Sequence, residues 1–583
     1  MGAADRRRFE EPGRAGLPRF RNTNIWTLVT QRAETMGERE FLVWHPYEGE
    51  GASWTYGELA ADAAALAAGL QSRGIRSGDR VLIHLENCPE FVIAWLACSA
   101  IGAVAVTTNT RSAADELRYF IDHSNARAAI TQPRLAELVA RCGPELTWVA
   151  VTDHDSGYGP EALAIEGTLE FRSLRGDASG LHPAPPDASA PLSVQYTSGT
   201  TSRPKGVVWT HANGLFAART NAVHEDLRAS DCHLVYMPLF HTNALAYSVL
   251  ATLWVGSRMV LVPKWSTSRF WPIVQTHRCT WVSLIPLSIR GIAQSKVPEH
   301  HSLRLLGGPV CDLPLDARLG VKTVGWWGMT ETLSHPIVGD VHVPNRPRSM
   351  GLPAPEWEVT VVDEAGLPAG VEEAGELLVR GVRGVSLFAE YLDDPAATAA
   401  AFDEEGWFRT GDRVVAHADG HLSFVDRSKD MLKVGGENVA ASEIERVLVE
   451  SGLVREAAVV SRRDPSLDEV PVAFVVPRSE PWEPGLPAAL REHCVEHLAD
   501  FKVPREVHVV AELPRSTINK VHKLALREVA APEQEAERAN AEGAWIRASR
   551  IDPSGDESAV IPTQPLPKDP ELEEDCLTAA AEI

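Results

Sequence analysis

The segment Tyr196–Val207 reads YTSGTTSRPKGV and gathers hydroxyls, glycines and one lysine, Lys205, into a single short loop. Backbone N–H groups, side-chain hydroxyls and an ammonium group are what proteins use to hold polyphosphate. The segment therefore predicts a binding site for a nucleoside triphosphate.

This loop differs from the common P-loop, which requires a glycine directly before the lysine and a serine or threonine directly after it. Pro204 and Gly206 stand at those two places. A different nucleotide-binding fold is therefore predicted. A serine- and threonine-rich surface loop without function is the competing interpretation, and the order of the residues argues against it.

The sequence on both sides of the loop predicts a layered α/β fold. Between Trp54 and Thr110 the pattern indicates an amphipathic helix near 56–70, a strand at 80–85 and an apolar helix near 91–100. Short apolar runs predict further strands at 128–130, 148–151, 234–237, 258–261 and 280–284. Such continuous apolar runs are typical of parallel strands that are buried on both faces.

The pattern changes toward the end of the chain. The segments WEVTVVD and GELLVRG, within 351–380, predict a small β-rich subdomain, and 428–527 mixes strands and helices as a compact α+β domain does. We therefore expect an N-terminal domain over 1–427, a C-terminal domain over 428–530 and an acidic tail over 531–583. The tail is poor in aromatic residues and rich in Pro, Ala and Glu, a composition typical of disorder.

Composition and charge restrict the function classes. The 583 residues are 44% hydrophobic and carry a net charge of -23, which disfavours nucleic acid and anionic membranes as partners. The eight cysteines form no C-x-x-C pair and show no zinc-like spacing. The start of the chain has no apolar run of signal-peptide length, and no later stretch offers about 18 uninterrupted apolar residues for an integral membrane segment. A cytoplasmic enzyme of small-molecule chemistry is therefore predicted.

The loop at 196–207 resembles the signature of the acyl-adenylate-forming superfamily, which includes acyl-CoA synthetases, adenylation domains of peptide synthetases and beetle luciferases. Further motifs follow in the family's order between about Trp54 and Arg527. The resemblance implies a large N-terminal domain of parallel-sheet αβ layers with a small β-rich subdomain, followed by a smaller, mobile α+β C-terminal domain. It also implies that ATP is bound by Thr197, Ser198, Gly199, Thr200, Thr201 and Lys205.

The segment GWWGMTE at 325–331 resembles the second motif of the family. An aromatic face suits an adenine ring, and a carboxylate is a hard oxygen ligand for Mg²⁺. The resemblance implies that Trp327 stacks on adenine beside Gly328, that Thr330 donates to a phosphate, and that Glu331 holds Mg²⁺ together with Thr200. Gly307 and Gly308 resemble the turn around the adenine. A buried tryptophan pair is the competing interpretation of GWWG.

The segments WFRTGD at 407–412 and DRSKDMLKVGGEN at 426–438 resemble the ribose and hinge motifs. An ionised carboxylate offers two acceptor oxygens and no donor, so Asp412 suits two ribose hydroxyls. Glycines let a ligand arm approach the backbone closely. The resemblance implies a ribose contact from Arg427, a hinge at Lys429, a nucleotide contact from Lys433, and a coenzyme A tunnel along Gly435 and Gly436. Ordinary charged turns would explain these segments without a ligand, although not the GG pair.

The segment LPRSTINKV at 513–521 resembles the motif of the family's catalytic lysine. The resemblance implies that Lys520 neutralises charge when a carboxylate attacks the α-phosphate. A solvated surface lysine is the ordinary alternative.

The segment PLFHTNA at 238–244 matches an element near the acyl pocket of the family, and it implies that His241 is a catalytic-site residue, an aromatic gate beside the substrate carboxylate. No partner histidine lies at useful spacing for a metal, and a core histidine is the default alternative.

Two positions depart from the family pattern, because Ser202 and Asn519 stand where glycine is usual. Where φ must be positive, serine costs about 1–2 kcal/mol, and asparagine tolerates this conformation better. Neither replacement removes a reacting group.

The resemblance implies two half-reactions. A carboxylate, already ionised near pH 7, attacks the α-phosphorus of Mg²⁺-bound ATP and gives acyl-AMP and pyrophosphate. The C-terminal domain then swings about Lys429, withdraws Lys520 and brings the GG segment over the adenylate, so that the thiolate of coenzyme A displaces AMP.

Three alternatives remain open at this point: acyl transfer to the phosphopantetheine of a carrier protein, a nucleotide-binding scaffold without catalysis, and a luciferase-like oxygenase. No carrier-like domain follows in the sequence, and the presence of the motif residues argues against a scaffold. PLFHTNA bears a faint likeness to carnitine/crotonobetaine-type ligases, but aliphatic, aromatic and small polar acids all fit the motifs.

Overall fold

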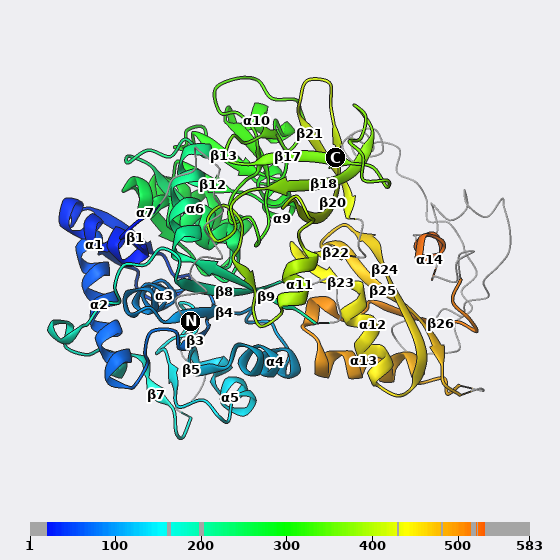
Figure 1. Cartoon of the computed structure of the whole chain (residues 1–583), viewed down its shortest axis with the longest axis horizontal. Coiled ribbons are helices and arrows are strands. Elements are labelled where there is room, and N and C mark those ends of the chain that lie inside the picture. Colours follow the sequence, from blue (N-terminus) through cyan, green and yellow to red (C-terminus); the bar gives the residue numbers. More distant parts are fainter. Residues whose placement is uncertain are drawn as a thin grey trace.

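The computed structural model describes residues 20–159, 165–197, 203–427, 431–479, 482–514, 521 and 523–530. Figure 1 shows two large helix-covered sheets in the first part of the chain, a small sheet beside them, and a smaller α+β unit built from the C-terminal elements.

The first large sheet has eight strands and carries the glycine-rich loop at one end. Its order is β19-β9-β8-β4-β3-β5-β6-β7. From β8 to β7 the neighbouring strands are parallel, whereas β9 pairs antiparallel with both β8 and β19. The strand bounds, in sheet order, are Glu390–Tyr391, Lys205–Thr210, Pro191–Thr197, Val104–Thr107, Arg80–His84, Ala126–Thr131, Val149–Val151 and Leu169–Glu170.

The second large sheet has nine strands in the order β16-β15-β14-β13-β12-β10-β11-β1-β2. The strands from β14 to β1 are parallel, and both ends of the sheet close with antiparallel pairs. The strand bounds, in sheet order, are Leu352–Pro353, Ile337–Val338, Lys322–Trp327, Leu305–Gly308, Trp281–Ser283, Cys232–Val235, Arg258–Leu261, Glu40–Trp44 and Ala52–Thr55.

Helices that are buried on most sides join the two large sheets into one core. Every residue of α3 (Pro89–Ile101) except Glu90 is buried, which explains why the sequence of this helix is otherwise largely apolar on all sides. It packs against α2 (Tyr56–Ser72), and both belong to one large apolar cluster with α1 (Ile25–Met36) and α6 (His211–His224). A π-helix, η4 (Asn243–Leu250), packs on α6 and continues into α7 (Ala251–Val255).

Shorter helices cover the outer faces of the sheets. They are α4 (Ala114–Ser124), α5 (Pro133–Cys142), α8 (Thr267–His277), α9 (Pro286–Gln294), α10 (Pro314–Leu319) and α11 (Pro395–Ala400). Among them α4 matters most for the site, because it contacts the C-terminal unit.

A four-stranded sheet connects the large sheets to the C-terminal unit. Its order is β17-β18-β20-β21, over Glu358–Val362, Ala374–Arg380, Phe408–Ala416 and Leu422–Arg427, and its pairs are antiparallel. This is the β-rich subdomain that the alternating segments predict.

The C-terminal unit packs helices on a mostly antiparallel sheet. Its strands are β22 (Met431–Val434), β23 (Glu437–Ala440), β24 (Val454–Asp464), β25 (Asp468–Pro477) and β26 (Glu506–Val509), and only β26 pairs in parallel. The helices are α12 (Ala441–Glu450), α13 (Leu486–His497) and α14 (Lys523–Ala530). The unit has its own apolar clusters, separate from the main core.

The predicted fold class, α/β with a large parallel-stranded part and a smaller C-terminal domain, is confirmed. Both large sheets are mixed, since antiparallel pairs accompany their parallel strands. The antiparallel pair of β8 and β9 follows from the length of the loop between them, since a parallel pair needs a crossover of a dozen or more residues. Across the described residues, no helix has the length and apolar character needed to cross a bilayer.

Candidate functional site

The glycine-rich loop is held at both ends by paired strands. Thr197 ends β8 and pairs with Lys205, the first residue of β9. The predicted phosphate-binding residues between them, Ser198, Gly199, Thr200 and Thr201, lie outside the described residues, as does Ser202. Thr197 and Lys205 therefore fix where the loop leaves and re-enters the sheet.

Lys205 and Glu331, two predicted ATP and Mg²⁺ residues, meet through a tyrosine. The ammonium of Lys205 lies 4.5 Å from the ring centroid of Tyr391, and the Tyr391 hydroxyl donates to Glu331 Oε1 at 2.9 Å. Burial and the neighbouring Glu331 carboxylate raise the pKa of Tyr391. Sequence reasoning missed Tyr391, because only the pairing of β19 with β9 brings it to this place.

A polar network surrounds Thr330. The Thr242 hydroxyl lies 3.3 Å from Thr330 Oγ1 and 3.0 Å from Gln195 Oε1. The carbonyl oxygen of Thr330 accepts a hydrogen bond from the indole of Trp209 at 2.9 Å. These contacts tie the second motif to β8, β9 and the segment before η4.

Trp327 and Asp412, the predicted adenine and ribose residues, contact each other directly. The Trp327 indole N–H donates to Asp412 Oδ2 at 2.8 Å, and both side chains are buried. Asp412 also pairs with Arg427 across β20 and β21, so the backbones of the two predicted ribose residues are neighbours. The structure therefore brings three of the predicted nucleotide residues to one place.

Two of the predicted adenine-site glycines are required by packing alone. A Cβ atom on Gly307 would lie 1.8 Å from Trp326 Cη2, and one on Gly328 would lie 2.5 Å from the Tyr247 hydroxyl oxygen. A Cβ on Gly308 would meet Thr323 at 3.0 Å, a milder contact. The glycines let the aromatic side chains behind the motif come close to its backbone.

His241 contacts the C-terminal unit. Its Nε2 lies 3.0 Å from Glu437 Oε1, which also accepts a hydrogen bond from the Asn109 amide at 3.3 Å. Burial by itself lowers the pKa of His241, but the Glu437 carboxylate outweighs burial, so the pKa is raised. Burial by itself raises the pKa of Glu437, but the neighbouring His241 outweighs burial, so the pKa is lowered. The pair is therefore an ion pair between the two parts of the chain.

The predicted coenzyme A glycines form the turn before Glu437. Gly435 and Gly436 have φ of +59° and +91°, a conformation that favours glycine. A Cβ on Gly436 would lie 3.4 Å from Ile285 Cδ1, so the turn rests against the N-terminal part of the chain. A cavity of about 70 Å³ lies beside it and is lined by residues of both parts, among them Thr197, His241, Glu437 and Lys502.

Lys502 anchors the C-terminal unit close to this cavity. Its ammonium group bonds Glu116 of α4 and, at 3.0 Å, Glu443 of α12, and all three side chains are buried. The backbone N–H of Ala499 donates to the second oxygen of Glu116 at 3.0 Å. Burial opposes the charge of Lys502, but the two carboxylates raise its pKa. The sequence motifs gave no indication of this anchor.

The remaining predicted residues stay predictions. Lys429 and Lys520 lie outside the described residues, as does Asn519. Lys433 lies on β22 with an exposed side chain, and its backbone N–H donates to Glu469 at 2.7 Å.

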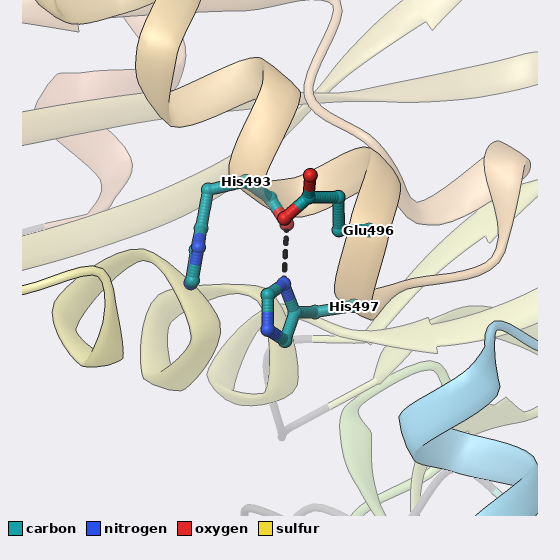
Figure 2. A group of neighbouring side chains, drawn as sticks. All are labelled: His493, Glu496 and His497. Carbon is teal, nitrogen blue, oxygen red and sulfur yellow. Dashed lines mark hydrogen bonds between the residues drawn. The ribbon is translucent and has the colours of Figure 1, made fainter. Parts of the chain in front are cut away.

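Two groups of potential metal ligands occur within the described part of the chain, and neither includes Glu331. One is Glu90, Asp153 and His154, and the other is His493, Glu496 and His497 on α13. Figure 2 shows the hydrogen bond between Nδ1 of His497 and the carbonyl oxygen of His493. The two atoms are 2.7 Å apart.

Comparison with known families identifies the chain. The model of the AMP-binding enzyme family matches residues 29–392, and that of the AMP-binding enzyme C-terminal domain matches residues 443–520. The chain therefore belongs to the AMP-binding enzyme family.

Curated relatives narrow the class. The crotonobetaine/carnitine–CoA ligases of Salmonella paratyphi C and Salmonella typhimurium are each 32% identical, over 519 and 517 residues, and the matches cover 86% of this chain and 99% of each relative. They support the acyl-CoA ligase branch of the family, an AMP-forming acid–thiol ligase with ATP, Mg²⁺ and coenzyme A as its reaction partners. The predicted enzyme class and cofactors are thereby confirmed.

Solved structures agree with this class. The o-succinylbenzoate CoA synthetase of Bacillus subtilis, a double mutant bound with its product analogue OSB-NCoA, matches with a TM-score of 0.74 at 26% identity, over 86% of this chain and 98% of that chain. The same enzyme in complex with AMP gives a TM-score of 0.60 at 27% identity, over 87% and 98%. The anthranilate CoA ligase AuaEII in complex with anthranoyl-AMP gives 0.64 at 25% identity, over 91% and 99%. The present arrangement is thus more similar to the complex with the coenzyme A product analogue than to the AMP complex of the same enzyme.

Proposed function

We propose that this ATP-dependent acyl-CoA ligase activates a short carboxylic acid that carries a trimethylammonium group and transfers the acyl group to free coenzyme A. Ligase chemistry through acyl-AMP follows from the family and its CoA-ligase members. The substrate class is inferred from the curated relatives, which are named for crotonobetaine and carnitine and which the chain matches over 99% of their length. Both named acids are trimethylammonium carboxylates.

The first half-reaction uses positioning and charge neutralisation. In this proposal Thr197, Lys205 and the loop between them bind the phosphates, Trp327 and Gly328 contact the adenine beside Gly307 and Gly308, and Asp412 and Arg427 bind the ribose. Lys433 is an additional nucleotide contact. Lys520 supplies a positive charge at the α-phosphate while the substrate carboxylate attacks.

Glu331 is the residue proposed to hold Mg²⁺, with Thr200 as a second ligand. Its carboxylate is a hard oxygen ligand, and the contact of Tyr391 with both Glu331 and Lys205 places it near the predicted phosphate lysine. When bound, the ion neutralises charge on phosphate oxygens. The residues present therefore fit this metal.

The second half-reaction is supported by the observed position of the GG turn. Gly436 approaches Ile285, and Glu437 pairs with His241 beside a cavity between the two parts of the chain. In the proposal the pantetheine arm passes this turn, His241 gates the acyl carboxylate, and Lys429 is the hinge about which the C-terminal domain turns. We retain the division into domains 1–427 and 428–530; the tail at 531–583 lies outside the described residues.

The test is pyrophosphate release by the purified protein with Mg²⁺-ATP, across carboxylic acids that include crotonobetaine, carnitine, a fatty acid and an aromatic acid, each with and without coenzyme A. The proposal expects turnover with the trimethylammonium acids that rises when coenzyme A is added. Adenylate without thioester in the presence of coenzyme A would point to a carrier protein, and preference for another acid would overturn the substrate class.

A further inference from the structure

Four rings pack behind the second motif; we call Tyr247, Trp281, Trp326 and His335 the aromatic cluster. Trp326 stacks on Trp281 at 5.7 Å with 4° between the rings, and on His335 at 4.5 Å with 11°. Tyr247 meets His335 edge-on at 4.2 Å and Trp326 at 5.9 Å. The glycines at 307 and 328 give these rings their close approach to the motif backbone.

A buried carboxylate lies beside the aromatic cluster. Glu225 is 1% exposed, and within the described part of the chain neither of its carboxylate oxygens has a hydrogen-bond partner. The Glu225 backbone carbonyl accepts a hydrogen bond from the Trp281 indole at 3.1 Å. Burial raises the pKa of the Tyr247 hydroxyl, and the nearby Glu225 carboxyl raises it further. A buried acid without a partner is costly when ionised and requires an explanation.

The titratable groups around Glu225 do not supply its partner. Its neighbour in sequence on α6, His224, bonds Glu356 at 3.2 Å. His335 stacks in the aromatic cluster, and burial lowers its pKa. Burial also lowers the pKa of His233, on β10, whose ring lies 4.7 Å from Trp281. Burial therefore disfavours the charged forms of His233 and His335, and the neighbours of Glu225 among the described residues are Trp281 and Tyr247 rather than a fixed cation.

We propose that Glu225 and the aromatic cluster form the subsite that binds the trimethylammonium group of the acyl substrate. Aromatic faces attract quaternary ammonium groups, and a carboxylate supplies the matching charge. The subsite adjoins the proposed reaction centre. Tyr247 lies on η4, which begins directly after Thr242, and Thr242 contacts Thr330. Trp326 directly precedes Trp327 in the sequence. This inference rests on the proposed function and names the residues that select its substrate.

Binding must part rings that touch in the ligand-free chain, and η4 is the element suited to yield. The element η4 is a π-helix, which is rare in proteins, and the π-helices that do occur often lie at functional sites. Movement of Tyr247 away from His335 would open a space for the cation beside His335 and Trp326, the two rings that Tyr247 meets. The tryptophan fluorescence of the protein should therefore change when a trimethylammonium acid binds.

Binding should also release a proton. Burial raises the pKa of the Glu225 carboxyl well above its usual range, which favours the protonated form in the free protein. A bound cation favours the ionised form, so the affinity for the cation should rise with pH, and a neutral ligand should have no such effect. Calorimetry in two buffers of different ionisation enthalpy, with Mg²⁺ and a non-hydrolysable ATP analogue present, measures this proton.

The decisive comparison uses two acids of one shape, 4-(trimethylammonio)butanoate and its neutral carbon isostere 5,5-dimethylhexanoate. In the unmodified protein we expect the charged acid to have the higher kcat/KM for pyrophosphate release. Glu225→Gln should lower kcat/KM for the charged acid by about 30-fold or more, and leave that for the neutral acid unchanged or raised. Glu90→Gln is the control, since Glu90 is a partly buried acid paired with His154 elsewhere in the fold, and it should leave the ratio of the two acids unchanged.

The outcomes separate this inference from the proposed function. The subsite would be overturned if both acids are activated, Glu225→Gln does not alter the ratio of their kcat/KM values, and binding releases no proton. That outcome would leave the ligase activity unaffected. Inactivity with both acids, while another acid is activated, would overturn the proposed substrate class itself. Tyr247→Leu provides a second variant, which should also reduce the preference for the charged acid, and the calorimetry needs no variant.

Discussion

The Nε2 atom of His241 lies 3.0 Å from Oε1 of Glu437, which joins the proposed acyl gate of the N-terminal part to the residue that follows the turn of Gly435 and Gly436. The two residues are 196 positions apart in sequence. Because Glu437 belongs to the C-terminal unit, this ion pair exists only while the GG turn is near the site. It is therefore specific to the arrangement that we propose for thioester formation.

Removing the charge of Glu437 should affect the second half-reaction. In Glu437→Gln the amide cannot replace the ion pair, and we expect thioester formation from supplied acyl-AMP to fall by about tenfold or more, as loss of a charge-assisted hydrogen bond of about 1.5–3 kcal/mol implies. The rate of adenylate formation should stay within twofold. Rapid-quench measurement of each half-reaction tests this, and an equal loss in both steps would contradict the assignment.

The arrangement should also depend on pH. The pKa of His241 is raised. The stabilisation that His241 gives to this arrangement is therefore complete below the ordinary pKa of histidine and is lost as the pH rises through the raised pKa. The pKa of Glu437 is lowered. The stabilisation that Glu437 gives to this arrangement is therefore present above the ordinary pKa of glutamate and is lost as the pH falls through the lowered pKa.

The C-terminal unit should thus hold this position best between those two pKa values. Distance measurements between fluorescent labels on the two parts would follow this population across pH. If Glu437→Gln and the unmodified protein have the same fraction of molecules in this position at every pH, the result would count against the ion pair.

Lys502 should be important for stability. Its ammonium group is buried between Glu116 and Glu443, and breaking such a buried ion pair typically costs about 3–5 kcal/mol. Lys502→Met should therefore weaken the packing of the C-terminal unit on α4 and lower the denaturant midpoint. The double variant with Glu116→Gln should recover part of the loss. No difference in unfolding between Lys502→Met and the unmodified protein would refute the anchor.

Lys520→Ala tests the proposed catalytic lysine. Removing the ammonium group should abolish adenylate formation, because the charge that develops at the α-phosphate is no longer neutralised. Thioester formation from supplied acyl-AMP should be largely spared. Arg478→Ala is a control for loss of an exposed cation elsewhere in the same unit, and it should leave both half-reactions unchanged. Equal loss of both half-reactions in Lys520→Ala would contradict the role.

Gly436→Trp should give the opposite pattern. The position has φ of +91°, and a Cβ there already approaches Ile285 within 3.4 Å, so an indole would obstruct the proposed pantetheine route. We expect normal adenylate formation with thioester formation reduced at least a hundredfold, measured with coenzyme A as acceptor. Unchanged thioester formation would argue that the thiol reaches the adenylate by another path.

Much of the fold follows from short-range patterns in the sequence. The apolar stretch of α3 and the strands near 80–84, 126–131 and 258–261 were predictable because parallel strands and buried helices leave continuous apolar runs. The pairing of β9 with β19 was not predictable, because it joins segments about 180 residues apart that carry no shared signal.

The site divides in the same way. Motifs predict Glu331, Asp412 and His241, because their chemistry is local in sequence. The contacts of Tyr391 with Glu331 and of Lys502 with Glu116 arise from tertiary packing, as does the buried position of Glu225, and no motif marks these residues. Packing also explains Gly307 and Gly328, which the resemblance alone connects with the adenine.

The most direct test of the account follows the oxygen atoms of the substrate. When the acid is labelled with ¹⁸O in its carboxylate and converted with ATP and coenzyme A, attack on the α-phosphorus predicts that one labelled oxygen appears in each AMP and none in pyrophosphate, as mass spectrometry would measure. Label in released phosphate, with ADP as the nucleotide product, would contradict activation through acyl-AMP.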